Sequence, residues 1–291
     1  MLCLGRNPSL HKNVVRRVRL ARYFDLAKLP PLPSQYLPPP GYKVPMFLND
    51  VLGICGPAAC AHALGQNSLA SSGVEILPTD AEVKAFYFGI TGGVDSGVDM
   101  ESMLSYWRTH ALHGEEIVGY AALDPGNTDQ LEAAMYIFEG AVINGASLPD
   151  RVVPDVGDWV TIPWTGSSGS PNPNNGHAFS QPGYVARGGP YFVTTWADCR
   201  SRMDKAFYAK YVDAPFVVLT HAIINQATQK SGNGFDAASL QQDIKDITSA
   251  PPPDQPPTPP SPGPSGCLSI KDMVGAFRAA ANYLEKHSEG E

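Results

Sequence analysis

Residues 49–64 read NDVLGICGPAACAHAL, and this stretch decides the fold. A glycine-containing turn leads into a run of small apolar residues, where Pro57 is tolerated only in the first turn of a helix. We therefore predict a buried helix that begins close to Cys55. At a helix N-terminus the dipole and the free backbone N–H groups favour the thiolate, which is the reactive form of cysteine. Cys55 is accordingly a candidate nucleophile.

A candidate base for this thiol lies in the second half of the chain. His177 follows the loop GSSGSPNPNNG (166–176) and opens the segment HAFSQPGYV (177–185), which reads as a strand. A histidine at this position is expected at the rim of a sheet, where it can take a proton from a nucleophile. His62 is less suitable, because two helical turns place it about 10.5 Å along the axis from Cys55.

The remaining periodicity predicts helices before the strands. Apolar residues at helical spacing mark helices over 80–88, 99–110 and 129–138. Short β-branched and aromatic runs mark strands over 141–149, 158–162, 177–185, 190–196 and 216–221. Helices early and strands late are typical of an α+β domain, so we expect the cysteine helix to pack on an antiparallel sheet.

Two groups of residues resemble the papain-like cysteine peptidases. Cys55, with Gly53 two residues before it and Asn49 six before it, resembles the nucleophile loop of that family. The runs GHAF (176–179) and YFVTTW (191–196), with Gly183-Tyr184 between them, resemble its histidine strand, its Gly-Tyr turn and its tryptophan-containing strand. The order and the spacing both match.

The resemblance implies a role for each matching residue. Asn49 stands where the family has a glutamine that donates to the oxyanion, and Thr194 stands where it has an asparagine that orients the histidine. Asp198 is an alternative orienting group, and Trp196 occupies the position of the family's tryptophan. The implied reaction is acyl transfer through a Cys-His thiolate, on a peptide or protein substrate, with no cofactor and no metal.

A closer resemblance is to papain-like proteins encoded by bacteriophages and prophages. It is carried by Trp107, by LPD (148–150) and by the run from Trp196 to His221, and the match as a whole covers residues 46–222. It implies cleavage of peptide or isopeptide bonds, in the host cytoplasm or in a phage particle. Two alternatives stay open: an inactive structural or assembly protein of the particle, and an enzyme that cuts cell-wall cross-links.

Composition divides the chain into four parts. We expect a basic arm and Pro-rich strap over 1–45, a papain-like domain over 46–230, a Pro-rich linker over 231–266 and an amphipathic helix over 267–291. The two end segments are candidate contacts with other subunits or virion proteins. The arm could also contact nucleic acid, because six basic residues and no acidic ones fall before Tyr23.

Several classes of protein are disfavoured by composition. The net charge of −7 argues against a general nucleic-acid binder. We expect neither a signal peptide nor a transmembrane segment, because arginines interrupt the apolar runs near the start and no run reaches about 18 apolar residues. Five scattered cysteines fit a reducing compartment better than a zinc site or a disulfide scaffold.

Overall fold

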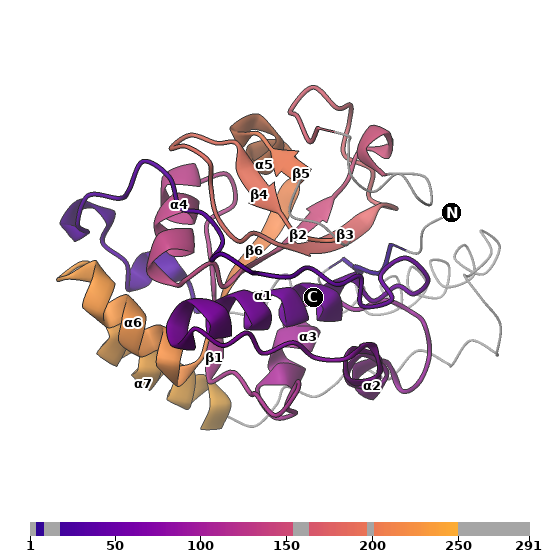
Figure 1. The fold of residues 1–291 in the computed structure, drawn as a ribbon, viewed down its shortest axis with the longest axis horizontal. Coiled ribbons are helices and arrows are strands. Elements are labelled where there is room, and N and C mark those ends of the chain that lie inside the picture. The colour runs from indigo at the N-terminus through magenta and orange to yellow at the C-terminus, as the bar shows by residue number, and fades with distance from the viewer. Residues whose placement is uncertain (1–3, 9–17, 154–162, 197–200, 250–291) are drawn as a thin grey trace, which may run out of the picture. The chain divides into compact units, whose positions relative to one another are not determined.

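The computed structural model describes residues 4–8, 18–153, 163–196 and 201–249, which belong to a compact unit spanning Met1–Pro253 (Figure 1). A second unit spans Asp254–Glu291. The predicted strand over 158–162, the predicted helix over 267–291 and the candidate residue Asp198 lie outside the described residues.

The helical part begins at the predicted cysteine. The helix α1 (Cys55–Ser72) starts at Cys55, and 14 of its 18 residues are buried. Such all-round burial is expected of a helix built from small residues, because they allow other elements to approach on every side. The next helices are α2 (Asp80–Thr91), capped by Thr79 and Glu82, and α3 (Met100–Trp107), capped by Asp99. Both lie within or close to the predicted ranges.

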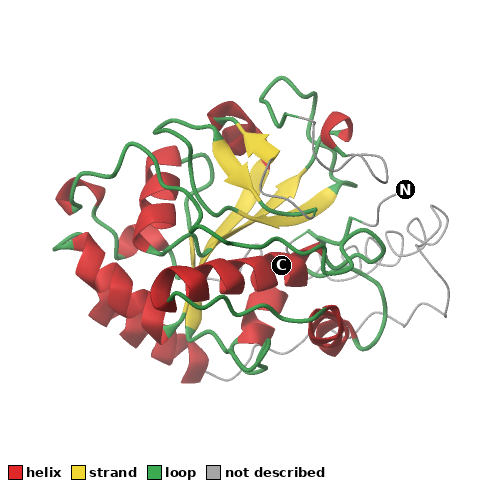
Figure 2. Ribbon diagram, in the orientation of Figure 1, coloured by secondary structure: helices red, strands yellow, loops and turns green. Residues whose placement is uncertain are grey.

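The strands form two antiparallel sheets. The larger has the order β1 (Gly119–Ala122), β6 (Val212–Leu219), β2 (Val142–Ser147) and β3 (Gly176–Ser180), and the smaller pairs β4 (Tyr191–Val193) with β5 (Ser201–Met203). The helix α1 packs against β2 and β3. Figure 2 shows the strands gathered together with most of the helices outside them. The predicted α+β architecture is confirmed.

The pairing of β2 with β6 contains a bulge. Gly145 faces Ala214, whereas the next residue, Ala146, faces Val212. Asp213 is therefore the extra residue of β6, without a partner in the ladder. An extra residue of this kind bends the strand and changes the direction of its side chain.

The compact body continues beyond the predicted boundary at residue 230. The other helices are α4 (Thr128–Ile137), α5 (Lys205–Tyr211), α6 (His221–Ser231) and α7 (Ala237–Ser249), with short 3₁₀ helices at Leu20–Arg22, Leu26–Lys28 and Asp150–Val152. The helix α7 occupies part of the segment expected to be a linker, and its Leu240 and Ile244 are buried. Their spacing of four residues is a helical signal that the neighbouring polar residues obscured.

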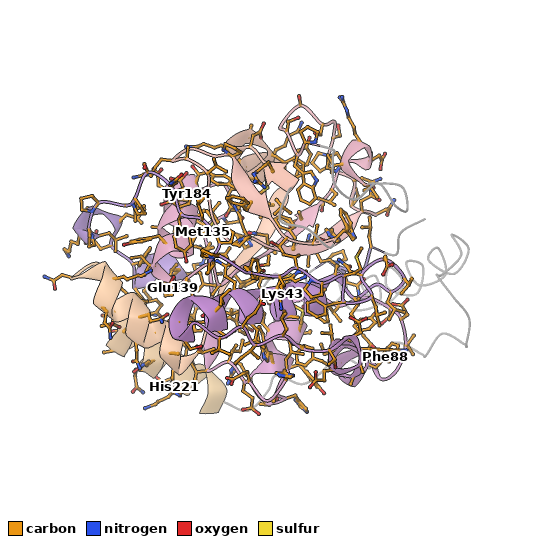
Figure 3. The ribbon with its side chains drawn as sticks, in the orientation of Figure 1. Lys43, Phe88, Met135, Glu139, Tyr184 and His221 are labelled. Carbon is orange, nitrogen blue, oxygen red and sulfur yellow. The ribbon has the colours of Figure 1, made fainter. Side chains whose placement is uncertain are left out.

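The proline-rich strap lies on the body through paired tyrosines. Tyr36 and Tyr184 exchange backbone hydrogen bonds of 2.9 and 2.8 Å, and the Tyr184 hydroxyl donates to Pro33 O at 3.0 Å. The Tyr36 hydroxyl donates to Glu139 Oε2 at 2.7 Å. Figure 3 labels Tyr184 and Glu139 on the part of the molecule where these contacts occur. Backbone pairing of this kind holds the stretch around Tyr36, which lies outside any helix.

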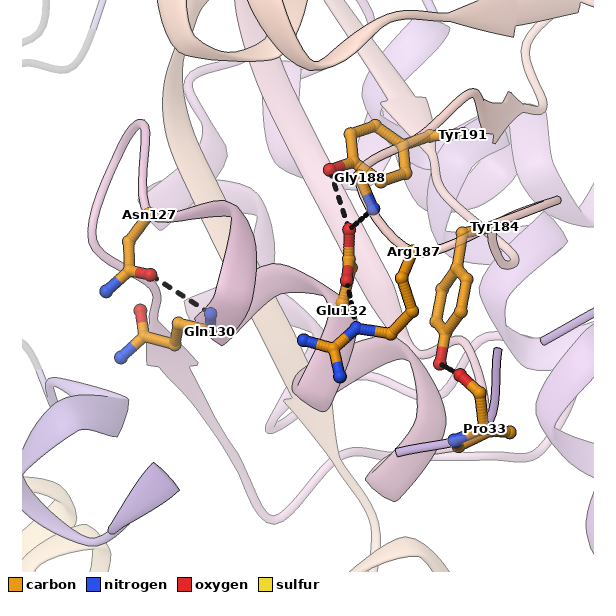
Figure 4. A network of polar contacts seen from close by, with 8 residues as sticks. All are labelled: Pro33, Asn127, Gln130, Glu132, Tyr184, Arg187, Gly188 and Tyr191. Atoms are coloured by element: carbon orange, nitrogen blue, oxygen red, sulfur yellow. Dashed lines mark hydrogen bonds and ion pairs between the residues drawn. The ribbon is translucent and has the colours of Figure 1, made fainter. Parts of the chain in front are cut away.

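A buried carboxylate ties α4 to the loop between β3 and β4. Glu132 is 1% exposed and accepts hydrogen bonds from Arg187 Nε at 2.9 Å, Gly188 N at 2.7 Å and the Tyr191 hydroxyl at 3.0 Å (Figure 4). A buried charge is tolerated only when its partners replace the water that it has lost. These three donors do so for Glu132.

Replacing Glu132 by alanine is expected to lower the free energy of unfolding by about 1–3 kcal/mol, because it leaves the Gly188 N–H and the Tyr191 hydroxyl without an acceptor, whereas the half-exposed Arg187 returns to water. Urea unfolding followed by circular dichroism measures the change. The exposed Glu116 provides the control, since Glu116→Ala should alter stability by less than about 0.5 kcal/mol. Equal losses in the two variants would contradict the role given to the network.

Candidate active site

The fold brings the two predicted reactive residues together. Cys55 is the first residue of α1, and His177 is the second residue of β3, on which α1 packs. The backbone N–H of Ala178, next to His177, donates to Cys55 Sγ at 3.3 Å. Both side chains are fully buried. The thiol and the imidazole thus lie on adjoining elements of one site.

His177 is held through one ring nitrogen and one ring face. Its Nε2 lies 2.6 Å from the Thr195 hydroxyl, and the indole of Trp196 stacks on the ring at a centroid distance of 4.4 Å and an angle of 19°. The other nitrogen, Nδ1, is buried and has no hydrogen-bond partner within the described residues. Nδ1 is therefore the nitrogen left to take a proton from the thiol.

The hydroxyl that meets His177 belongs to Thr195, the residue after the predicted Thr194. Thr194 exchanges backbone hydrogen bonds with Ser180, at 2.9 and 3.0 Å, and so continues the pairing of the strands. Successive residues of an extended strand point to opposite faces. The side chains of Thr194 and Thr195 therefore point to different faces, and it is the hydroxyl of Thr195 that lies at His177 Nε2.

Asn49 also contacts Thr195. Its Nδ2 donates to Thr195 O at 3.2 Å and to Thr195 Oγ1 at 3.3 Å. With one lone pair of Oγ1 engaged by Asn49, the second can accept from an Nε2–H of His177, which leaves Nδ1 as the basic nitrogen. In this structure Asn49 supports the histidine through Thr195, whereas the sequence assigned it to the oxyanion.

Burial controls the charge state of the pair. It raises the pKa of the Cys55 thiol, and the opposing influence of the Ala178, Gly5 and Gly56 N–H groups does not offset it. Burial also lowers the pKa of His177 to about 3. In the arrangement described here, the site therefore holds a neutral thiol and a neutral imidazole at pH 7.

The cover over Cys55 is the chain's own N-terminal segment, residues 4–8. Arg6 N donates to Gly176 O at 3.1 Å. On the other side, Val98 N donates to Gly5 O at 2.7 Å, and Asn7 N donates to Val98 O at 2.8 Å. The sequence assigned these residues to an arm that contacts partners. It carried no signal for this intramolecular contact, which depends on backbone groups that any residue supplies.

Gly5 fits against the turn before Cys55 because it has no side chain. A Cβ at this position would lie 1.7 Å from Gly53 O, closer than real atoms approach. The turn itself is fixed by Asp95, whose Oδ1 accepts from Gly53 N at 2.9 Å and from the Tyr87 hydroxyl at 2.7 Å. Asp95, in the glycine-rich segment 89–97, thus supports the site.

Two other residues that could have been reactive, His62 and Cys60, are packed in the core. His62 is buried, and its Nε2 lies 2.8 Å from Pro45 O, while Cys60 is buried beside Met103. Within the described residues, no three histidine, cysteine or acidic side chains are grouped so that they could hold a metal ion. Nor does that part of the chain contain a helix with the length and apolarity needed to cross a bilayer.

Comparison with known proteins identifies the fold. No family model matches the sequence, and no curated protein does. Among solved structures, xylellain, a cysteine protease from Xylella fastidiosa, is similar with a TM-score of 0.54 and 16% identity over 75% of this chain and 96% of that one. Digestive procathepsin L2 from the Tenebrio molitor larval midgut gives a TM-score of 0.51 and 12% identity over 75% and 78%. The chain has the papain-like fold.

Proposed function

We propose that this chain is a cysteine peptidase or amidase, described here in a latent state in which residues 4–8 cover its nucleophile. The observation that carries the proposal is the arrangement around His177. Its Nε2 is bonded to Thr195 and its face is covered by Trp196, while Nδ1 is left without a partner on the strand that contacts Cys55. Such an orientation serves proton transfer from a thiol.

The mechanism begins when residues 4–8 leave the site. His177 Nδ1 takes the proton of Cys55, and the thiolate attacks the carbonyl carbon of a peptide or isopeptide bond. The oxyanion lies at the start of α1, where the N–H groups of Cys55 and Gly56 have no partner within the helix. The imidazolium then gives its proton to the leaving amine. Water, deprotonated by His177, cleaves the thioester, releases the acid and restores the thiol.

The source and setting proposed for this enzyme rest on sequence resemblance. Trp107, LPD (148–150) and the run from Trp196 to His221 resemble papain-like proteins of phages and prophages. We place the enzyme with that group, acting in a host cell or in a phage particle. A substrate for such an enzyme is a protein or a peptide, since the reaction is acyl transfer from an amide.

A structural protein that keeps the papain-like shape without turnover is the second candidate. It is favoured by the complete burial of Cys55 and by the hydroxyl of Thr195 at a place where the family has an amide. The cover over Cys55 is a short terminal segment, held by three backbone hydrogen bonds, by the pairing of Arg6 with Asp213 and by a hydrogen bond from Asn7 Nδ2 to Ser96 O. A cover of this kind can leave without unfolding the body, which favours the enzyme.

Hydrolysis of a denatured, fluorescently labelled protein by the full chain carrying Gly5→Val tests the proposal. We expect turnover in this background, its loss on adding Cys55→Ser, and its retention on adding Cys60→Ala, because Cys60 is buried in the core. Mass spectrometry of the products locates the cleaved bonds. Fluorescence release that is equally fast with and without Cys55 would rule out the enzyme and favour the structural protein.

A further inference from the structure

The side chain of Arg6 is buried beside the reactive cysteine. Its guanidinium forms a two-point contact with Asp213: Nη1 donates to Oδ2 at 3.1 Å, and Nη2 pairs with Oδ1. The side chain of Arg6 is 7% exposed, whereas that of Asp213 is 50% exposed. A planar guanidinium and a carboxylate match one another in this geometry better than any other pair of side chains.

The space around the Arg6 side chain, which we call the Asp213 pocket, is bounded by Asp213, Gly145 and Met100. It exists because Gly145 has no side chain. A Cβ on Gly145 would lie 2.7 Å from Arg6 Nε and 3.1 Å from Met100 Cγ. Gly145 therefore leaves the room that the arginine fills. A side chain at this position of β2 would compete with Arg6 for that room.

The bulge in β6 supplies the carboxylate. Asp213 is the extra residue opposite Gly145 and Ala146, so its side chain does not follow the alternation of the strand. The hydroxyl of Ser147 donates to Asp213 Oδ2 at 3.3 Å and steadies the carboxylate. The space that Arg6 fills and the carboxylate that it meets thus lie on two neighbouring strands.

The pocket has a fixed place relative to the reacting atoms. Arg6 N is bonded to Gly176 O, immediately before His177, and the preceding residue, Gly5, covers Cys55. When residues 4–8 leave, a substrate that reaches Cys55 must pass the same backbone groups. The side chain of a neighbouring residue then faces Asp213 and Gly145.

We propose that the Asp213 pocket selects an arginine side chain in the peptide that replaces residues 4–8. This inference rests on the proposed peptidase function and names the substrate class of that site. The carboxylate attracts a guanidinium and repels acidic side chains, and a neutral side chain of the same shape leaves the acid without a charged partner. Arg6, in the segment that covers Cys55, occupies the pocket through the same pairing of guanidinium and carboxylate.

Peptide binding tests the proposal without requiring turnover. The receptor is the full chain carrying Gly5→Val, Arg6→Ala and Cys55→Ser, and the probe is the acetylated, amidated peptide Leu-Gly-Arg-Asn-Pro, which copies residues 4–8. Isothermal titration compares it with the same peptide carrying citrulline, which is neutral and nearly isosteric with arginine. We expect the citrulline peptide to bind at least about tenfold more weakly.

Two further receptors locate the source of this preference. Adding Asp213→Asn should abolish the difference between the two peptides, because the half-exposed carboxylate is removed without a change of shape. Adding Gly145→Val should weaken the binding of the arginine peptide, because the pocket is filled. Equal affinities for the two peptides, a preference that survives Asp213→Asn, or no binding of the arginine peptide would each overturn the proposal.

The result is separable from that of the turnover assay. A preference for arginine without hydrolysis would support the pocket while contradicting the peptidase. Hydrolysis with equal affinity for the arginine and citrulline peptides would support the peptidase while contradicting the pocket.

Discussion

Replacing Gly5 by valine is expected to speed alkylation of Cys55 at pH 7 by at least about 100-fold. The valine Cβ cannot occupy its place 1.7 Å from Gly53 O, so the backbone at Gly5 must move, and we expect residues 4–8 to leave the site. Water then reaches the thiol and the main cause of its raised pKa, burial, is removed. Each unit by which that pKa falls gives about ten times more thiolate at neutral pH, and only the thiolate reacts.

The dependence of this reaction on pH should also change. In the covered state the pKa of His177 is about 3, lowered by burial, so the imidazole stays neutral above that pH. Once exposed, it returns toward its ordinary value near 6.5 and can stabilise the thiolate as an imidazolium. The open chain should therefore react with iodoacetamide well below pH 7, where the covered chain should react slowly.

The same pKa shift predicts how acid affects the cover. In a Cys55→Ser chain, which has no thiol proton to release, the open state binds a proton on His177 between about pH 6.5 and 3 that the covered state does not, so the stability of the cover falls as the pH falls. In that chain the protection of the Arg6 N–H against hydrogen exchange should consequently fall over this range. Adding His177→Ala should remove this dependence on pH.

Pro8→Val provides the matched control for the valine at Gly5. Pro8 is exposed at the end of the same segment, so a valine there leaves the backbone contacts of Gly5 and Arg6 intact. Peptide mass spectrometry over time gives the rate at Cys55, with the buried Cys60 as an internal reference. If the two valine variants react at the same rate, residues 4–8 are not what protects the thiol.

Local patterns in the sequence predict where the elements that carry Cys55 and His177 begin. The small residues after Gly53, with Pro57 in the first turn, fix where α1 starts. The loop before His177 and the alternating residues after it fix β3. Signals of this kind depend on neighbours in the chain, and they place Cys55 and His177 on elements that an α+β fold brings together.

The contacts that complete the site have no such local signal. Arg6 and Asp213 are 207 residues apart, and the bulge that aims Asp213 is set by the pairing of β2 with β6. A bulge of one residue reverses which side chains face the site, so the exposure of Asp213 to a ligand follows only from the register. The cover formed by residues 4–8 likewise rests on backbone hydrogen bonds and on the absence of a side chain at Gly5.

The orienting residue shows how the sequence-based assignment and the structure can differ by one position. Spacing from Trp196 points to Thr194, yet β4 ends at Val193 and the bridge to Ser180 continues through Thr194. A count along the sequence cannot tell which of two adjacent threonines faces the histidine, because neighbours in an extended strand face opposite ways.

Thr195→Val is expected to lower kcat/KM by about 100-fold in the chain opened by Gly5→Val. The hydroxyl accepts from Asn49 and contacts His177 Nε2, and valine preserves the shape while removing the acceptor. The imidazole then loses the bond that keeps Nδ1 basic and directed at the thiol, which weakens its action as a general base. Because Thr195 acts through His177, we regard it as a positioning residue.

Two substitutions separate this role from a loss of packing. Thr195→Ser restores the acceptor with less bulk, so it should recover most of the activity, and the pH profile of kcat should return with it. Thr194→Val should reduce kcat/KM less than Thr195→Val, since Nε2 is bonded to Thr195. Steady-state kinetics on one peptide substrate give both comparisons. A larger loss at Thr194, or no recovery with serine, would mean that the hydroxyl of Thr195 does not orient the base. The tautomer of His177 would then be set by the stacked indole and the surrounding backbone alone.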